Sequence, residues 1–146
     1  MSKPIYVLSG PNLNMLGKRE PEIYGHQTLD DIHKSLSEKA SKQKIELNCH
    51  QSNHEGQLVD LIQEAGNKAS GLIINAGALT HTSIALADAI RAIDIPAIEV
   101  HMSNVYHREE FRHHSYLSPV VIGLICGFGS QSYELALDVL LREEQR

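Results

Sequence analysis

Short apolar runs alternate with amphipathic segments from one end of this 146-residue chain to the other. The apolar runs lack strict apolar–polar alternation, which is typical of strands covered on both faces of a sheet. We therefore predict five strands, at residues 5–8, 45–49, 71–74, 96–100 and 120–125. The second run is the weakest of these, so we expect it nearer an edge of the sheet.

Helices fill the intervals between the predicted strands. A helix is predicted over 28–42, because Thr28 can cap it and Asp31, three residues on, completes a capping-box pattern. Asn53 is the predicted cap of a second helix over 53–69, whose apolar residues recur on one face. Further helices are predicted from Thr82 or a neighbour, near 107–114, and from Ser130 through 141.

Strands that are each followed by a helix predict a parallel sheet with right-handed crossovers. We expect an α/β fold: a flavodoxin-like three-layer sandwich whose five parallel strands have the order 2-1-3-4-5. The length suits one domain over residues 1–146. Residues 10–27 show no clear periodicity, and so long a loop in a compact domain is usually a lid or a binding loop.

Composition excludes several classes of protein. The formal net charge is −5 and no basic stripe is visible, which argues against nucleic acid as a partner. No stretch is long and apolar enough for a transmembrane helix, so we expect no membrane association. The N-terminus carries no signal-peptide pattern, and Cys49 and Cys126 lie in apolar runs as expected for free thiols. We therefore expect a cytoplasmic protein.

Reactive side chains gather after the predicted strands, where ligands bind in an open parallel sheet. Each of these side chains also has a purely structural interpretation. Asn12 and Asn75 could be turn formers, and His101 could be a hydrogen-bonded core histidine. Arg108 and Arg112, four residues apart on a predicted helix, could form a solvated face. Their convergence on one edge favours a functional site.

Other chemistries fit less well. Although nine histidines are present, His113 and His114 would point to different helix faces and neither cysteine has a metal-like partner, so no metal is expected. Residues 127–130 could present amides to an anion at a helix N-terminus, but no Walker or dinucleotide pattern is present. Only Lys18 lies near the carboxyl edge, which disfavours imine chemistry.

Two alternatives share the expected fold. A flavodoxin-like module that binds FMN or a phosphorylated ligand would need a hydroxyl-rich first loop, where this chain has Asn, Arg and Tyr. A signalling receiver domain would need an acidic pair after the first strand and an aspartate after the third, where Asn75 stands.

Several motifs, in order and over nearly the whole chain, resemble one family, the type II 3-dehydroquinate dehydratases. The matching segments are 10–17, 19–21, 24–25, 51–56, 74–78, 81–83, 88–89, 99–104 and 108–113. The resemblance implies that a proton leaves the carbon beside the ketone of 3-dehydroquinate, an enolate forms, and the tertiary hydroxyl leaves as water in the shikimate pathway. It implies no metal and no cofactor.

The resemblance also assigns residue roles. Tyr24 is the base, Arg19 its activator, His101 the acid, and Asn12 holds a water at the enolate oxygen. The side chains implied to bind substrate are those of Asn75, His81, Asp88 and Arg112. Met102 and Ser103 are implied to bind it through their backbone. The family's usual assembly is a dodecamer of four trimers, so a homo-oligomer is expected, with Asp88 supplied by a neighbouring subunit.

The physics of the site is compatible with these roles. Making a tyrosinate dominant at pH 7 requires about 4 kcal/mol, whereas an exposed ion pair supplies roughly 1 kcal/mol or less. A closed lid must therefore exclude water around Arg19 and Tyr24. Glu99 lies two residues before His101, so both side chains face the same side of a strand. We therefore count Glu99 among the catalytic residues, because a carboxylate there can orient the imidazole and keep it protonated.

Overall fold

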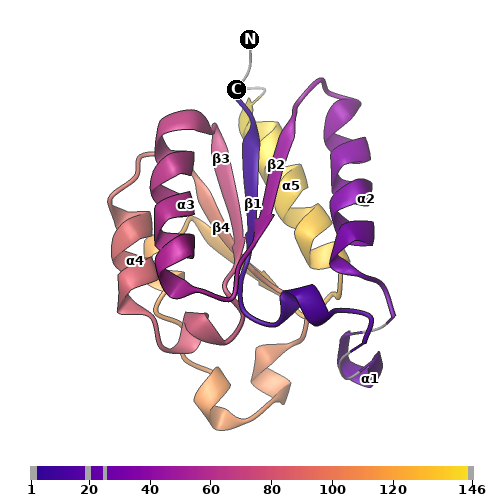
Figure 1. The fold of residues 1–146 in the computed structure, drawn as a ribbon, viewed down its shortest axis with the longest axis vertical. Helices are drawn as coiled ribbons and strands as arrows, with labels where there is room; N and C mark the ends of the chain where they lie inside the picture. The colour runs from indigo at the N-terminus through magenta and orange to yellow at the C-terminus, as the bar shows by residue number, and fades with distance from the viewer. Residues whose placement is uncertain (1–2, 19–20, 25, 145–146) are drawn as a thin grey trace.

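In the computed structural model, residues 3–18, 21–24 and 26–144 are described, with the backbone alone at 23 and 24. They form one parallel sheet in the order β2-β1-β3-β4-β5, which confirms the predicted order 2-1-3-4-5 and places β2 at an edge (Figure 1). The strands are β1 (Ile5–Ser9), β2 (Leu47–Gln51), β3 (Gly71–Asn75), β4 (Ala97–His101) and β5 (Gly123–Cys126). The inner strands β1, β3 and β4 are buried along their whole length, whereas the edge strand β5 is partly exposed rather than covered on both faces.

Helices cover both faces of the sheet and make the three-layer sandwich that the sequence predicts (Figure 1). The helices α2 (Leu29–Ser41) and α5 (Gln131–Glu144) pack on one face, and α3 (Glu55–Lys68) and α4 (Ile84–Arg91) on the other. The short helix α1 (Pro21–Tyr24) follows β1. Short 3₁₀ helices lie in the loops, namely η1 (Leu13–Met15), η2 (Gly77–His81), η3 (Val105–His107), η4 (Glu110–Arg112) and η5 (Ser118–Val120). Among the described helices, none is long and apolar enough to cross a membrane.

Local signals fix the ends of α2. The side chain of Thr28 accepts the N–H of Asp31 at 3.1 Å and the Asp31 carboxylate accepts the N–H of Thr28, which confirms the predicted capping box. At the other end Lys44 adopts φ 59° and the N–H of Ile45 bonds to the carbonyl of Ala40. This Schellman-type ending keeps Ile45 with the helix, so β2 starts at Leu47 instead of residue 45.

Three predicted elements differ from the structure. The cap of α3 is His54, because the side chain of Asn53 is used elsewhere. The short helix predicted near 107–114 is two 3₁₀ turns, interrupted by extended backbone at Arg108. The strand predicted over 120–125 begins at Gly123, because residues up to Val120 form η5. The predicted cap region of α4 is confirmed at Ser83, a neighbour of Thr82, whose side chain accepts the N–H of Leu86.

Candidate active site

A cavity of about 220 Å³ lies at the carboxyl ends of the strands. Five residues of the predicted site line it, namely Asn12, Asn75, His81, Met102 and Arg112. The other lining residues are Pro11, Leu13, Leu16, Gly77, Ala78 and Arg108. The structure therefore brings these five side chains together at one edge of the sheet.

The turn after β1 brings Asn12 into the cavity wall. A Cβ at Gly10 would lie 2.5 Å from the carbonyl oxygen of Ala76, so only glycine lets this turn approach the end of β3 so closely. Asn12 adopts φ 71°, a conformation that asparagine tolerates better than most residues. Its N–H donates to Oδ1 of Asn53 at 3.0 Å, which is the bond that takes Asn53 away from the helix cap.

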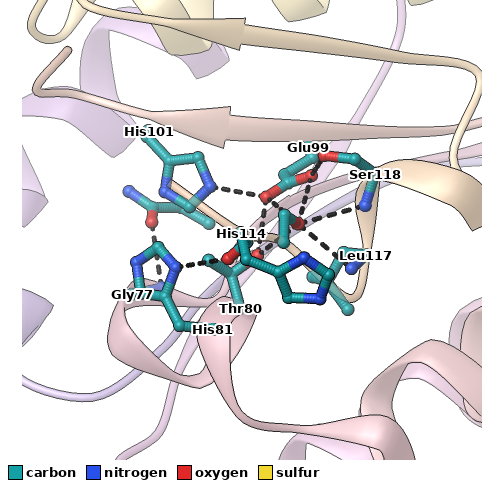
Figure 2. Close-up of polar contacts among 10 residues, drawn as sticks. Gly77, Thr80, His81, Glu99, His101, His114, Leu117 and Ser118 are labelled. Atoms are coloured by element: carbon teal, nitrogen blue, oxygen red, sulfur yellow. Dashed lines mark hydrogen bonds and ion pairs between the residues drawn. The ribbon is translucent and has the colours of Figure 1, made fainter. Parts of the chain in front are cut away.

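His81 reaches the cavity from η2. Its Nδ1 lies 2.8 Å from the carbonyl oxygen of His114, and a carbonyl only accepts, so Nδ1 carries the hydrogen (Figure 2). Burial lowers the pKa of His81, and the nearby positive charges of His101 and Arg112 lower it further, against the opposing effects of the His114 carbonyl and Glu99. His81 is therefore neutral near pH 7, and its Nε2 is a hydrogen-bond acceptor.

Glu99 and His101 form a buried pair at the end of β4. Nε2 of His101 lies 2.6 Å from Oε2 of Glu99, whose side chain has no exposed surface (Figure 2). The His101 ring stacks on that of His81 at 6.3 Å between centroids, with 15° between the planes. His81 lines the cavity, whereas His101, which stacks on it, does not.

Three hydroxyl groups complete the surroundings of the Glu99 carboxylate. Thr80 donates to it at 2.6 Å and Ser118 at 2.7 Å (Figure 2). Ser115 donates to it at 2.8 Å. The Ser115 oxygen already accepts the N–H groups of Leu117 and Ser118, which directs its own hydrogen to Glu99.

These contacts keep Glu99 ionised. Burial alone would raise the pKa of Glu99, but the hydrogen bonds from His101, Thr80 and Ser118 and the charge of His101 outweigh it and hold the pKa at about 2. Because the carboxylate accepts, Nε2 of His101 must donate to it. Sequence reasoning missed the three hydroxyl donors, because only tertiary contacts bring them to Glu99 and no sequence motif predicts them.

Two guanidinium groups lie at the cavity, from Arg108 and Arg112. Nε of Arg112 donates to Glu109 at 2.9 Å, and the same group stacks over the Phe111 ring at 5.1 Å. The predicted site omits Arg108, because the family resemblance assigns a substrate-binding role to Arg112 only. The break between η3 and η4 brings both to the cavity.

Four predicted residues whose side chains the structure describes do not line the cavity, namely Glu99, His101, Asp88 and Ser103. Asp88 lies on α4, exposed and 3.3 Å from Arg91, and Ser103 is half-buried beside the wall. Arg19 lies outside the described residues, and only the backbone of Tyr24 is described, at the end of α1. At Met102 the backbone carbonyl already accepts the N–H of Gly129 at 2.9 Å.

Histidine, cysteine and carboxylate side chains do not cluster as a metal site anywhere in the described ranges. Cys49 and Cys126 are both free, as the sequence predicts, but they are half-buried rather than buried.

Comparison with known proteins agrees with this geometry. Residues 3–141 match the family model described as dehydroquinase class II. A 3-dehydroquinate dehydratase of Acaryochloris marina is 56% identical over 146 residues, covering 99% of this chain and 98% of that protein. One of Nostoc sp. is 60% identical over 137 residues, covering 94% and 93%.

Solved structures show the same fold. A type II dehydroquinase from Butyrivibrio crossotus superposes with a TM-score of 0.93 at 46% identity, covering 95% of this chain and 97% of the other. The enzyme from Propionibacterium acnes gives a TM-score of 0.92 at 45% identity, covering 96% and 97%. Sequence, fold and the side chains gathered at the carboxyl edge agree, and this chain belongs to the class II dehydroquinase family.

Proposed function

We propose that this chain is a 3-dehydroquinate dehydratase of the shikimate pathway, which removes water from 3-dehydroquinate through an enolate and releases 3-dehydroshikimate. Family membership supports the reaction. The observation that carries the proposal is the 2.6 Å contact between His101 and the buried Glu99, because loss of a hydroxyl group as water needs a proton donor.

The acid in this proposal is His101. The ionised carboxylate of Glu99 accepts from Nε2 and fixes the orientation of the ring. The proton on the other ring nitrogen, Nδ1, is then the one that His101 gives to the leaving hydroxyl.

The base in this proposal is Tyr24, activated by Arg19. Because the structure describes neither of these two side chains, their roles rest on the family motif in residues 19–25. Proton abstraction by a tyrosinate requires roughly 4 kcal/mol of stabilisation relative to a free tyrosine, so water must be excluded around the pair. Tyr24→Phe should lower turnover by about 10² to 10⁴ with a smaller effect on binding.

The cavity wall would bind the rest of the substrate. The acceptor Nε2 of His81 suits a substrate hydroxyl, and the guanidinium groups of Arg108 and Arg112 suit its carboxylate. Asn12 would hold a water at the developing enolate oxygen. The family motif adds Asn75 and the backbone of Met102 and Ser103 to the binding set.

This mechanism uses neither a metal nor a cofactor. A tyrosinate base and an imidazolium acid suffice for enolate chemistry, so chelators should leave turnover intact. Borohydride added with substrate should trap no covalent adduct, because no imine forms. Inhibition by a chelator, reversed by a divalent ion, would contradict this part of the proposal.

We also propose a homo-oligomer, with trimers arranged in a dodecamer and Asp88 completing the site of a neighbouring subunit. Asp88 lies outside the cavity wall of its own chain, and Ile84 on the same helix is 58% exposed. An exposed aspartate beside an exposed isoleucine on α4 suits a contact between subunits.

Mixing two impaired variants tests the shared site. In a cyclic trimer assembled at random from Asp88→Asn and Tyr24→Phe chains, about a quarter of all sites combine two intact residues. Activity after co-refolding should rise well above either parent, toward that fraction. If Asp88 served its own chain, the mixture would show only the average of the two parents.

The reaction itself is tested by an ultraviolet assay for the conjugated enone of the product. The proposal predicts a steady rise in absorbance when the protein is added to 3-dehydroquinate, and no rise would contradict it.

The free thiols of Cys49 and Cys126 suit the reducing cytoplasm that we propose as the location.

A further inference from the structure

The phenol of Tyr133 is buried directly behind the candidate active site. Tyr133 lies near the start of α5 and has no exposed surface. Its hydroxyl lies 2.9 Å from Oγ of Ser9 and 3.0 Å from Nδ2 of Asn75. Ser9 and Asn75 are the last residues of β1 and β3 and are register partners, so the phenol joins the ends of two neighbouring strands.

The hydrogen bonds around Asn75 have only one consistent direction. The N–H of Gly77 can only donate, and it lies 3.1 Å from Oδ1 of Asn75. The nitrogen of the carboxamide therefore faces Tyr133, whose hydroxyl accepts one of its hydrogens. The phenol hydrogen is left for Oγ of Ser9.

This arrangement leaves one carboxamide hydrogen of Asn75 uncommitted among the described contacts, in a residue that lines the cavity. Burial raises the pKa of Tyr133 to about 12 against the opposing effect of its hydrogen bonds to Ser9 and Asn75. The phenol therefore stays neutral through the working pH range and remains able to accept from Asn75.

We propose that Tyr133 is a positioning residue for the reaction: its hydroxyl holds the Asn75 carboxamide in one orientation, so that the remaining N–H is available to an oxygen of the substrate. This inference rests on the proposed function. A carboxamide that can turn over exchanges donor for acceptor, and a misplaced acceptor would face a substrate oxygen that also accepts. Tyr133 acts through Asn75 and does not itself contact substrate.

Tyr6 provides a matched control within the same chain. It is also buried, and its hydroxyl donates to Glu64 at 2.6 Å. It lies on β1 against α3, on the opposite face of the sheet from Tyr133, and does not line the cavity. Tyr6→Phe and Tyr133→Phe each remove one buried phenolic hydroxyl, but only the second removes a partner of Asn75.

The kinetic experiment compares these two variants with the wild type on 3-dehydroquinate. Loss of one well-placed neutral hydrogen bond corresponds to about a tenfold change in an equilibrium. Tyr133→Phe should lower kcat/KM by about tenfold, mostly through KM, whereas Tyr6→Phe should leave both constants near the wild-type values. In an Asn75→Ala background, Tyr133→Phe should cause no further loss, because its effect passes through Asn75.

Two controls keep the outcome decisive. If Tyr133→Phe does not fold, Ser9→Ala, which removes only the acceptor of the phenol hydrogen, should lower kcat/KM about two- to threefold. The side-chain amide signal of Asn75 in a ¹⁵N NMR spectrum, assigned by its loss in Asn75→Ala, should shift and exchange faster in Tyr133→Phe (or in Ser9→Ala in its place) but not in Tyr6→Phe. This second readout needs no turnover, so failure of the proposed function would be distinguishable. An unchanged amide signal in the folded variant, or equal kinetics for Tyr133→Phe and Tyr6→Phe, would overturn the inference.

Discussion

The carboxyl and amino edges of the sheet differ in what they bury. In the described part of the chain, the buried serine, threonine, asparagine, glutamate and histidine side chains lie at or beyond the carboxyl ends of the strands, apart from Glu99, which lies two residues before the end of β4. These residues are Ser9, Ser52, Asn75, Thr80, Ser83, Glu99, His101 and Ser132. The amino edge is instead filled by apolar groups such as Leu72 and Ala97, and a Cβ at Gly71 would lie 3.1 Å from Leu140.

This difference separates stability from chemistry along the strands. A buried polar group is unfavourable unless it is hydrogen-bonded, and the carboxyl edge meets that condition with donors arranged around Glu99 and Asn75. Toward the amino edge the burial is mainly apolar, and the hydroxyl of Tyr6 is satisfied by Glu64. Substitutions at the two edges should therefore affect different properties.

The largest expected effect is at the carboxyl edge. His101→Ala should lower kcat for 3-dehydroquinate by about 10² to 10⁴, because the acid is lost. The variant should still unfold cooperatively on heating. A fall in melting temperature with little loss of turnover in the ultraviolet assay would make His101 a core residue only.

At the amino edge the expectation is reversed. Leu72 is fully buried in β3, so Leu72→Ala should lower the free energy of unfolding by about 2 to 5 kcal/mol. Turnover per folded molecule should stay close to the wild-type value. Urea denaturation gives the first quantity and the assay gives the second. Val139→Ala, at a position 39% exposed on α5, is the control and should be affected less.

Lowering the pH should lower the free energy of unfolding, because Glu99 at the carboxyl edge becomes protonated. The pKa of Glu99 falls from its ordinary 4.5 to about 2 on folding, so its contribution is complete above about pH 4.5 and is lost as the pH falls through 2. The loss amounts to about 3 kcal/mol. Over that range Glu99→Gln should lose less stability than the wild type in urea denaturation at fixed pH. Glu110→Gln, an exposed substitution, should follow the wild-type curve.

The smallest expected effect lies at the capping box of α2. Thr28→Ala should lower the free energy of unfolding by about 1 kcal/mol, because the N–H of Asp31 loses its acceptor. Thr28→Ser keeps the hydroxyl and should lose much less. Equal losses for the two variants, measured by thermal unfolding, would show that the cap is not what stabilises this end.

The sequence predicted the features that depend on local patterns better than those that depend on contacts between distant residues. The sheet order and the capping box follow from local patterns, namely apolar runs and the Thr28–Asp31 spacing, and the structure confirms both. The cap of α3 was wrong because Asn53 bonds to Asn12, which is distant in sequence. The single short helix predicted near 107–114 was wrong, because the backbone is extended at Arg108, between two 3₁₀ turns.

The candidate active site likewise contains some residues that local pattern predicts and others that only the tertiary fold brings together. Glu99 and His101 could be paired from strand alternation alone, since two residues apart on a strand face one side. The hydroxyls of Ser115 and Ser118 and the phenol of Tyr133 could not, because only the tertiary fold brings them to the strand ends. Arg19 and Tyr24 remain predictions from the family motif.

The central claim is that Glu99 and His101 act as one unit at the carboxyl edge. A double-mutant cycle on kcat, with Glu99→Gln, His101→Ala and the combined variant, tests it most directly. The account predicts that the combined variant turns over 3-dehydroquinate about as slowly as His101→Ala alone, because Glu99 has no role without the imidazole. A combined loss equal to the product of the two single losses would show that the two residues act independently and would contradict the account.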